Sequence, residues 1–298
     1  MKISLRFFAA LLACLFLTPS LAHAQPRHSD EIVTPTPVAL SATDAATELA
    51  DFRHGRLDGD FCLAFELTHL PRRGDETDYT GVAWGTWNDQ WPITRFRIKE
   101  KAAATANAGQ PAATPVTWEW LVQNGPAPRI WVFAPGTMAA REVPPSEWRT
   151  PVFPGAVYTP FDLLMPFLYW TDATYSGAGR VSDRGVDIFT LKSPVAEQTA
   201  GIANVRVSLD RELKALVRTE QLDPKGVVVR QFDLGSFTKV QGQWMIESCR
   251  LTDLTTHDYD EFNVKAAALK LKLDAAIFDP AKLATKAELP SESAWANL

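Results

Sequence analysis

The sequence is short of the residues that build metal and redox sites. Its 298 residues include only three cysteines and five histidines, and no Cys-x-x-Cys pair is present. Zinc ribbons and thioredoxin-like redox centres are therefore excluded, because both need closely spaced thiolates. The motifs G-x-S-x-G, H-E-x-x-H, Walker A and G-x-G-x-x-G are missing as well. No catalytic site, metal site or cofactor is predicted, and the protein is not expected to be an enzyme.

Positive charge and long apolar runs are also scarce. The chain has 30 Lys and Arg against 35 Asp and Glu, a net charge of −5. A nucleic-acid partner is not expected, since such proteins carry a basic face or tail. Beyond the N-terminus, no apolar run reaches the roughly 20 residues of a membrane-spanning helix. The most apolar stretch, 161–170, is interrupted by Asp162 and Pro166.

The first 24 residues have the pattern of a secretory signal peptide. Lys2 and Arg6 precede an apolar run over 7–17, and Ala22-His23-Ala24 supplies a small-x-small cleavage site. Export of the protein is therefore predicted. The alternative is acylation at Cys14, because the preceding Leu-Leu-Ala loosely resembles a lipobox.

Cys62 and Cys249 remain after removal of the signal peptide. In an oxidising compartment these two thiols can form a disulfide. The other interpretation is two buried free thiols on separate strands, and the sequence does not decide between them.

The rest of the chain divides into a flexible tether over 25–42, one domain over 43–275 and a C-terminal tail over 276–298. A short helix is predicted over 43–52, since Ala45, Leu49 and Phe52 share one face. After Gly59 the apolar pattern has period two, which is typical of strands. The predicted strands are 61–70, 80–87, 93–99, 116–123, 129–133, 185–191, 203–209, 215–221, 227–234 and 243–252, with 264–273 a strand or a helix.

The alternation is clearest over 116–123. Trp118, Trp120 and Val122 share one face there, whereas Glu119 and Gln123 lie on the other. Such a strand is typical of an antiparallel sheet with one buried face. Strands do not alternate with helices, which excludes a doubly wound parallel sheet. The prediction is a mainly β, antiparallel meander of about ten strands with short helical insertions.

Tryptophan is in surplus, with ten Trp against five Tyr. Eight of the ten lie between Trp84 and Trp170. Ordinary cores favour Leu, Ile and Val, whereas the walls of an apolar ligand site suit large, rigid aromatic rings. The alternative is that these rings simply fill an all-β core. The apolar insertion over 161–170 is a candidate lid for such a ligand site.

Several segments together resemble the outer-membrane lipoprotein-sorting family, the LolA-like periplasmic lipoprotein carriers. The similarity covers about residues 60–265 and consists of diffuse strand and turn patterns. The segments that carry it are Arg129-Ile130-Trp131-Val132-Phe133-Ala134-Pro135, Arg141-Glu142-Val143-Pro144, Phe161-Asp162-Leu163-Leu164, Asp187-Ile188-Phe189-Thr190-Leu191, the strand 205–210 and Asp223-Pro224-Lys225-Gly226.

This resemblance implies a curved antiparallel half-barrel whose concave apolar face is covered by short helices. It also implies a monomeric periplasmic carrier that binds the acyl chains of lipoproteins or other lipids. Its partners would be an inner-membrane release complex and an outer-membrane acceptor. The expected cavity residues are Trp84, Phe96, Trp118, Trp120, Trp131 and Phe133, and the expected lid residues are Leu163, Leu164, Phe167 and Leu168.

The resemblance also implies an arginine that holds the lid shut. Arg95 and Arg97 are candidates for this role, or they belong to a solvated basic face. Two other functions remain possible beside the carrier hypothesis. The same fold could serve as a regulatory module that senses lipid or lipoprotein. The other function is that of an enzyme with chemistry around Asp162, Tyr158 or His69, because a fold does not fix a function.

Overall fold

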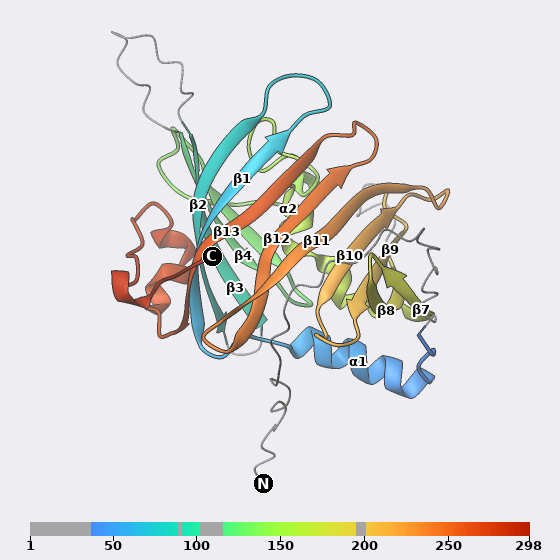
Figure 1. Cartoon of the computed structure of the whole chain (residues 1–298). Helices are drawn as coiled ribbons and strands as arrows, with labels where there is room; N and C mark the ends of the chain where they lie inside the picture. The colour runs from blue at the N-terminus through green and yellow to red at the C-terminus, as the bar shows by residue number, and fades with distance from the viewer. Residues whose placement is uncertain (1–36, 89–90, 102–115, 195–200) are drawn as a thin grey trace, which may run out of the picture. The chain divides into compact units, whose positions relative to one another are not determined.

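A single antiparallel sheet dominates the structure, a computed structural model that describes residues 37–88, 91–101, 116–194 and 201–298. Within these residues the sheet has 14 strands in the order β6-β5-β4-β3-β2-β1-β13-β12-β11-β10-β9-β8-β7, and β14 pairs with β13. The sheet is strongly curved (Figure 1), and the two end strands of this order, β6 and β7, do not pair with each other. The expected mainly β, curved antiparallel fold class is confirmed, although the strands exceed the predicted ten.

The additional strands are short or have little apolar pattern. β6, β7 and β14 were not predicted, and the undecided segment over 264–273 belongs to β13. The predicted signal peptide, most of the predicted tether and residues 102–115 lie outside the described residues. The strands are β1 Asp60–Leu70, β2 Thr77–Asn88, β3 Trp91–Glu100, β4 Thr117–Gln123, β5 Arg129–Phe133, β6 Arg141–Glu142, β7 Ala173–Val181, β8 Arg184–Lys192, β9 Asn204–Asp210, β10 Leu216–Leu222, β11 Val228–Val240, β12 Gln243–Asp253, β13 Tyr259–Leu271 and β14 Ala296–Asn297.

The predicted N-terminal helix is present as α1, Ala42–His54. Its N-cap is Ser41, whose hydroxyl accepts a hydrogen bond from the backbone N–H of Asp44. Ala45 and Leu49, one helical turn apart, are buried against the inner face of the sheet around β8–β10. The helix therefore covers one end of the sheet, as Figure 1 shows.

The pleat of the strands divides the sheet into an inner, concave face and an outer, convex face. In β4, Trp120 and Val122 point to the inner face and join a buried cluster with Phe65 of β1. Leu121, between them in sequence, points to the outer face and packs against Leu283. Both faces of this part of the sheet are therefore buried.

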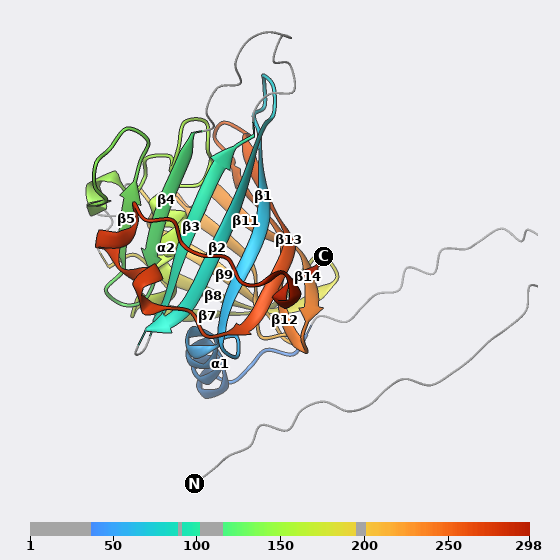
Figure 2. The ribbon, with the colours of Figure 1, turned by 90° about the vertical axis from the view of Figure 1, so that its left-hand side faces the viewer.

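The outer face is covered by the C-terminal segment, as Figure 2 shows. After β13 the chain forms three short 3-10 helices, η3 Ala275–Phe278, η4 Pro280–Lys282 and η5 Glu292–Ala294, before it reaches β14. Leu283 and Ala287 of this segment are buried against the sheet. The segment expected to be a tail is thus packed on the domain.

The two cysteines of the domain are free. Cys62 of β1 packs beside Trp84 on the outer face, whereas Cys249 of β12 lies against the inner core cluster. The structure agrees with the interpretation of two free thiols on separate strands.

Candidate functional site

The candidate site is formed by the inner face of the sheet and a lid of two short helices, α2 Pro160–Leu164 and η2 Pro166–Tyr169. The local sequence explains both helices. Thr159 caps α2, and the two prolines occupy first-turn positions, where no N–H is needed. Met165 between the helices has a left-handed backbone with φ of 42°. The lid is therefore a bent segment with few hydrogen bonds of its own.

Apolar side chains of the lid fill the concave face. Leu164 has no exposed surface and packs with the cluster around Trp120, and Phe167 is 1% exposed in the neighbouring cluster. Leu163 and Leu168 are partly buried against the same two clusters. All four predicted lid residues thus contact the inner face, and their role in ligand release stays a prediction.

Asp162 fixes the first turn of the lid. One carboxylate oxygen accepts hydrogen bonds from the backbone N–H and the hydroxyl of Thr159, at 2.9 and 2.7 Å. The other accepts from Nε2 of Gln221 in β10, at 2.8 Å. Asp162 is thus the third residue of a capping box whose N-cap is Thr159, and its further contacts join the lid to the sheet.

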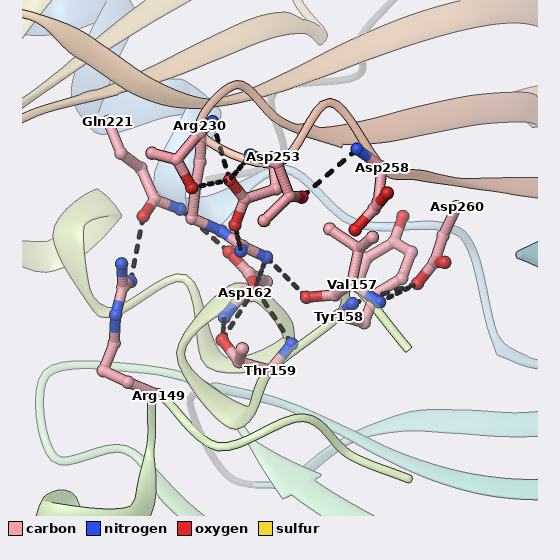
Figure 3. Close-up of polar contacts among 12 residues, drawn as sticks. Arg149, Val157, Tyr158, Thr159, Asp162, Gln221, Arg230, Asp253, Asp258 and Asp260 are labelled. Atoms are coloured by element: carbon pink, nitrogen blue, oxygen red, sulfur yellow. Dashed lines mark hydrogen bonds and ion pairs between the residues drawn. The ribbon is translucent and has the colours of Figure 1, made fainter. Parts of the chain in front are cut away.

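The main attachment of the lid is Arg230 of β11, which is 7% exposed (Figure 3). Its Nη2 donates to the backbone carbonyl of Val157 at 2.6 Å and to the carboxylate of Asp162 at 2.7 Å. Its Nη1 donates to Asp253 of β12 at 3.0 Å. One guanidinium group therefore connects the lid, the chain just before it and two strands.

A second carboxylate holds the chain that leads into the lid. Asp260 of β13 has no exposed surface, and one of its oxygens accepts from the backbone N–H groups of Val157 and Tyr158, at 2.8 and 3.0 Å. The other oxygen lies 2.8 Å from Nδ1 of His69. These contacts fix the backbone at the start of the lid (Figure 3).

Side chains outside the lid also bind backbone carbonyls at the C-terminal ends of α2 and η2. Nδ2 of Asn124 donates to the carbonyls of Leu163 and Leu164, at 3.1 and 2.8 Å. Arg53 of α1 donates to the carbonyls of Leu168, at 2.5 Å, and Trp170, at 2.9 Å. The last carbonyls of a helix have no partners within the helix. These side-chain donors supply the missing hydrogen bonds.

Several polar side chains around the lid are buried away from water. Burial, and next the neighbouring Cys249, raise the pKa of the Tyr158 hydroxyl well above its ordinary value. Burial likewise lowers the pKa of Arg149, which donates to Gln221. Burial alone would raise the pKa of Asp253, but hydrogen bonds from Thr255 and the charge of Arg230 outweigh it, so this pKa is lowered. The polar contacts of the lid are therefore poorly screened by water.

The structure separates the six aromatic residues predicted to line a cavity. Phe96, Trp118 and Trp120 lie in the inner cluster with Leu164. Trp84, Trp131 and Phe133 lie on the outer face, packed with or beside the C-terminal segment. The prediction that all six aromatic residues line one cavity is therefore wrong for Trp84, Trp131 and Phe133. Adjacent residues of a strand point to opposite faces, and the C-terminal segment buries the aromatic side chains of the outer face.

A cavity of about 370 Å³ opens beside the lid at the inner face of β4–β6. Its walls include Trp118, Trp120, Val132 and Phe153, and Pro160 connects it to the start of α2. Small-molecule sites usually have volumes of about 300–1,000 Å³ and mostly apolar walls. The cavity has the size and the lining of such a site.

Neither arginine considered from the sequence contacts the lid. Arg95 and Arg97 point to the outer face and share the carboxylate of Glu119, at 2.9 and 2.5 Å. Arg95 is only 1% exposed, so a solvated basic face does not describe it either. Arg230 was missed because an isolated arginine in an alternating strand has no sequence feature that distinguishes it from a solvent-facing one.

Two further features bear on the chemistry. Among the described residues, no group of His, Cys, Asp and Glu gathers as a metal site requires. Within the same residues, no helix is long and apolar enough to span a bilayer.

Comparison with known proteins rests on structure, since neither a protein family nor a curated protein matches the sequence. A candidate outer membrane lipoprotein-sorting protein domain from Vibrio parahaemolyticus superposes with a TM-score of 0.65. A LolA superfamily protein from Nitrosomonas europaea gives a TM-score of 0.53. The fold is LolA-like.

The LolA-like fold extends over most of the chain. The Vibrio domain covers 80% of this chain and 97% of its own length, at 13% identity. The Nitrosomonas protein covers 81% and 98%, also at 13% identity. A DUF1329 family protein from Desulfovibrio piger has a TM-score of 0.62 at 13% identity, covering 80% and 96%. At such low sequence identity, the structural similarity establishes the fold alone. The activity has to be inferred from the residues of the site.

Proposed function

We propose that the protein is a periplasmic carrier, acting as a monomer. It binds the acyl chains of lipoproteins, or of related amphiphiles, between the lid and the inner face of the sheet, and it transfers them towards the outer membrane. An inner-membrane release complex and an outer-membrane acceptor are the partners that such transfer requires. Carriage needs an apolar shelter and no catalytic group.

The observation that carries this proposal is the way in which the lid occupies the concave face. Leu164 and Phe167 are buried there as completely as core residues. They belong, however, to helices of five and four residues, which are too short to be stable without their contacts to the sheet. An acyl chain could take the place of these side chains on the concave face.

The energetics favour such an exchange. Each methylene removed from water contributes about 0.8 kcal/mol, so a long acyl chain gains much from an apolar shelter. Opening the lid exposes its apolar side chains and breaks the contacts of Arg230 with Val157 and Asp162. The ligand therefore pays for opening with its own burial, and affinity should rise with chain length.

The test is titration of the purified protein with fluorescent acyl probes of increasing chain length. We expect binding that tightens from 8 to 16 carbons, since roughly 0.8 kcal/mol per buried methylene is about fourfold in affinity. A probe with the same fluorophore and no acyl chain is the control. If no probe binds at any length, or if the control binds equally, the proposal fails.

A further inference from the structure

A buried hydrogen-bond donor without a partner lies at the wall of the cavity beside the lid. Trp120 lines this cavity and is 5% exposed. Its Nε1 is shielded from solvent and finds no acceptor within the described part of the chain. An unpaired buried donor destabilises a fold, and folded proteins keep few of them. The indole N–H is covered in this structure, so an acceptor brought by a ligand can reach it only when the chain around it moves.

The other walls define which acceptor fits. Val132, Val143 and Phe153 make the lining mainly apolar. The two charged residues at the cavity, Arg141 and Glu147, pair with each other at 2.7 Å and so offset each other's charge. A carboxylate would lose its hydration here without gaining a free cation, which is unfavourable. A neutral oxygen attached to an apolar chain suits these walls.

We infer that the cavity holds the linkage end of an acyl chain, with the Trp120 indole N–H donating to the carbonyl oxygen of an ester or amide. This inference rests on the proposed carrier function and specifies its ligand. Trp120 then favours chains in ester or amide linkage over plain hydrocarbons, which leave the N–H unpaired. It also favours them over free fatty acids, which carry a charge.

Access to this donor is coupled to the lid. Residues 150–154, which line the cavity opposite the sheet, belong to the same chain that continues through Pro160 into α2. Displacement of the lid by an acyl chain therefore moves the wall that faces Trp120. The donor is shielded while the lid is closed and meets the ligand when the lid opens.

The test compares methyl hexadecanoate with an alkane of matched length, each displacing a fluorescent acyl probe from the full chain. The wild type should bind the ester about 2–10 times more tightly, which is the usual range for one added neutral hydrogen bond. Trp120→Phe should remove this preference, so that the variant binds the ester and the alkane with equal affinity. Trp118→Phe, at the wall of the same cavity, is the matched control and should keep the preference.

Three outcomes would overturn the inference. If the wild type binds ester and alkane with equal affinity, the hydrogen bond from Trp120 is refuted, whereas the proposed carrier function is not. If Trp120→Phe still prefers the ester, the conclusion is the same. Failure of both compounds to displace the probe counts against the inference and the proposed function together.

A second measurement does not depend on the variant folding. In wild-type protein labelled at the indole nitrogen, one buried Trp N–H resonance should move downfield with methyl hexadecanoate and not with the alkane. The same spectrum with and without either ligand contradicts the inference.

Discussion

Replacement of Arg230 by Met tests whether the lid is held shut by this side chain. The substitution removes the donors to Val157, Asp162 and Asp253 and keeps an unbranched apolar stem of similar reach. Asp162 keeps its contacts with Thr159 and Gln221, so its carboxylate is not left without partners. The lid should therefore loosen more than the sheet.

The magnitude follows from the burial of the pair. Removing one partner of a buried ion pair costs about 3–5 kcal/mol. Because Asp162 retains other donors, we take the lower end, about 3 kcal/mol, which corresponds to an increase of about 100-fold in the ratio of open to closed lid. A ligand that binds the open form gains affinity by up to this factor, until the open form predominates.

Hydrogen exchange over 157–170 and titration with a 16-carbon fluorescent probe measure these two effects. Arg218→Met is the matched control, since Arg218 pairs with Asp233 at a site where both side chains are about 30% exposed. Such a pair contributes about 0.2–1 kcal/mol. We expect faster exchange in the lid and tighter probe binding for Arg230→Met alone. Unchanged or weaker binding, with a loss of global stability, would show that the lid is ordinary core.

Three further predictions concern the thiols, the outer face and one glycine. Burial raises the pKa of Cys62 and of Cys249 to about 12, so neither should react with Ellman's reagent at pH 8 until the protein unfolds. Because both values exceed those of an unfolded chain, their contribution to stability is complete below about pH 9 and falls as the pH rises towards 12, as urea titrations at several pH values would show. Arg95→Met should lower the free energy of unfolding by about 3–5 kcal/mol and expose 272–298 to proteases, without altering probe affinity, because Arg95 donates to three carbonyls of that segment. Gly81→Ala places a methyl carbon 2.2 Å from Cζ of Phe65, so we expect a loss of about 1–3 kcal/mol in urea denaturation, and an unchanged midpoint would contradict this packing.

The sequence predicted the positions of the strands better than it predicted which face of the sheet each side chain occupies. The strand expected over 116–123 is present as β4, with Trp118 and Trp120 on the inner face as the alternation indicated. In β5, by contrast, Trp131 and Phe133 alternate with Ile130 and Val132, so both faces are apolar. The reason is the C-terminal segment, which buries the outer face, and a strand buried on both sides carries no period-two signal.

The lid illustrates a similar limit. Its apolar residues were predicted because they are adjacent in sequence, but the groups that hold it come from distant positions. Arg230 and Asp260 lie about 70 and 100 residues beyond the lid, and each is one of several polar residues in its strand. Contacts of this kind depend on the register of the sheet, which the pattern of a single strand does not contain.

Native mass spectrometry of the protein purified from the membranes of its host is the direct test of acyl-chain carriage. We expect species heavier than the polypeptide by the mass of an acylated lipid or lipoprotein, and we expect these species to be lost when a 16-carbon probe is added in excess. A clean polypeptide mass, together with no uptake of the fluorescent acyl probe, would contradict it.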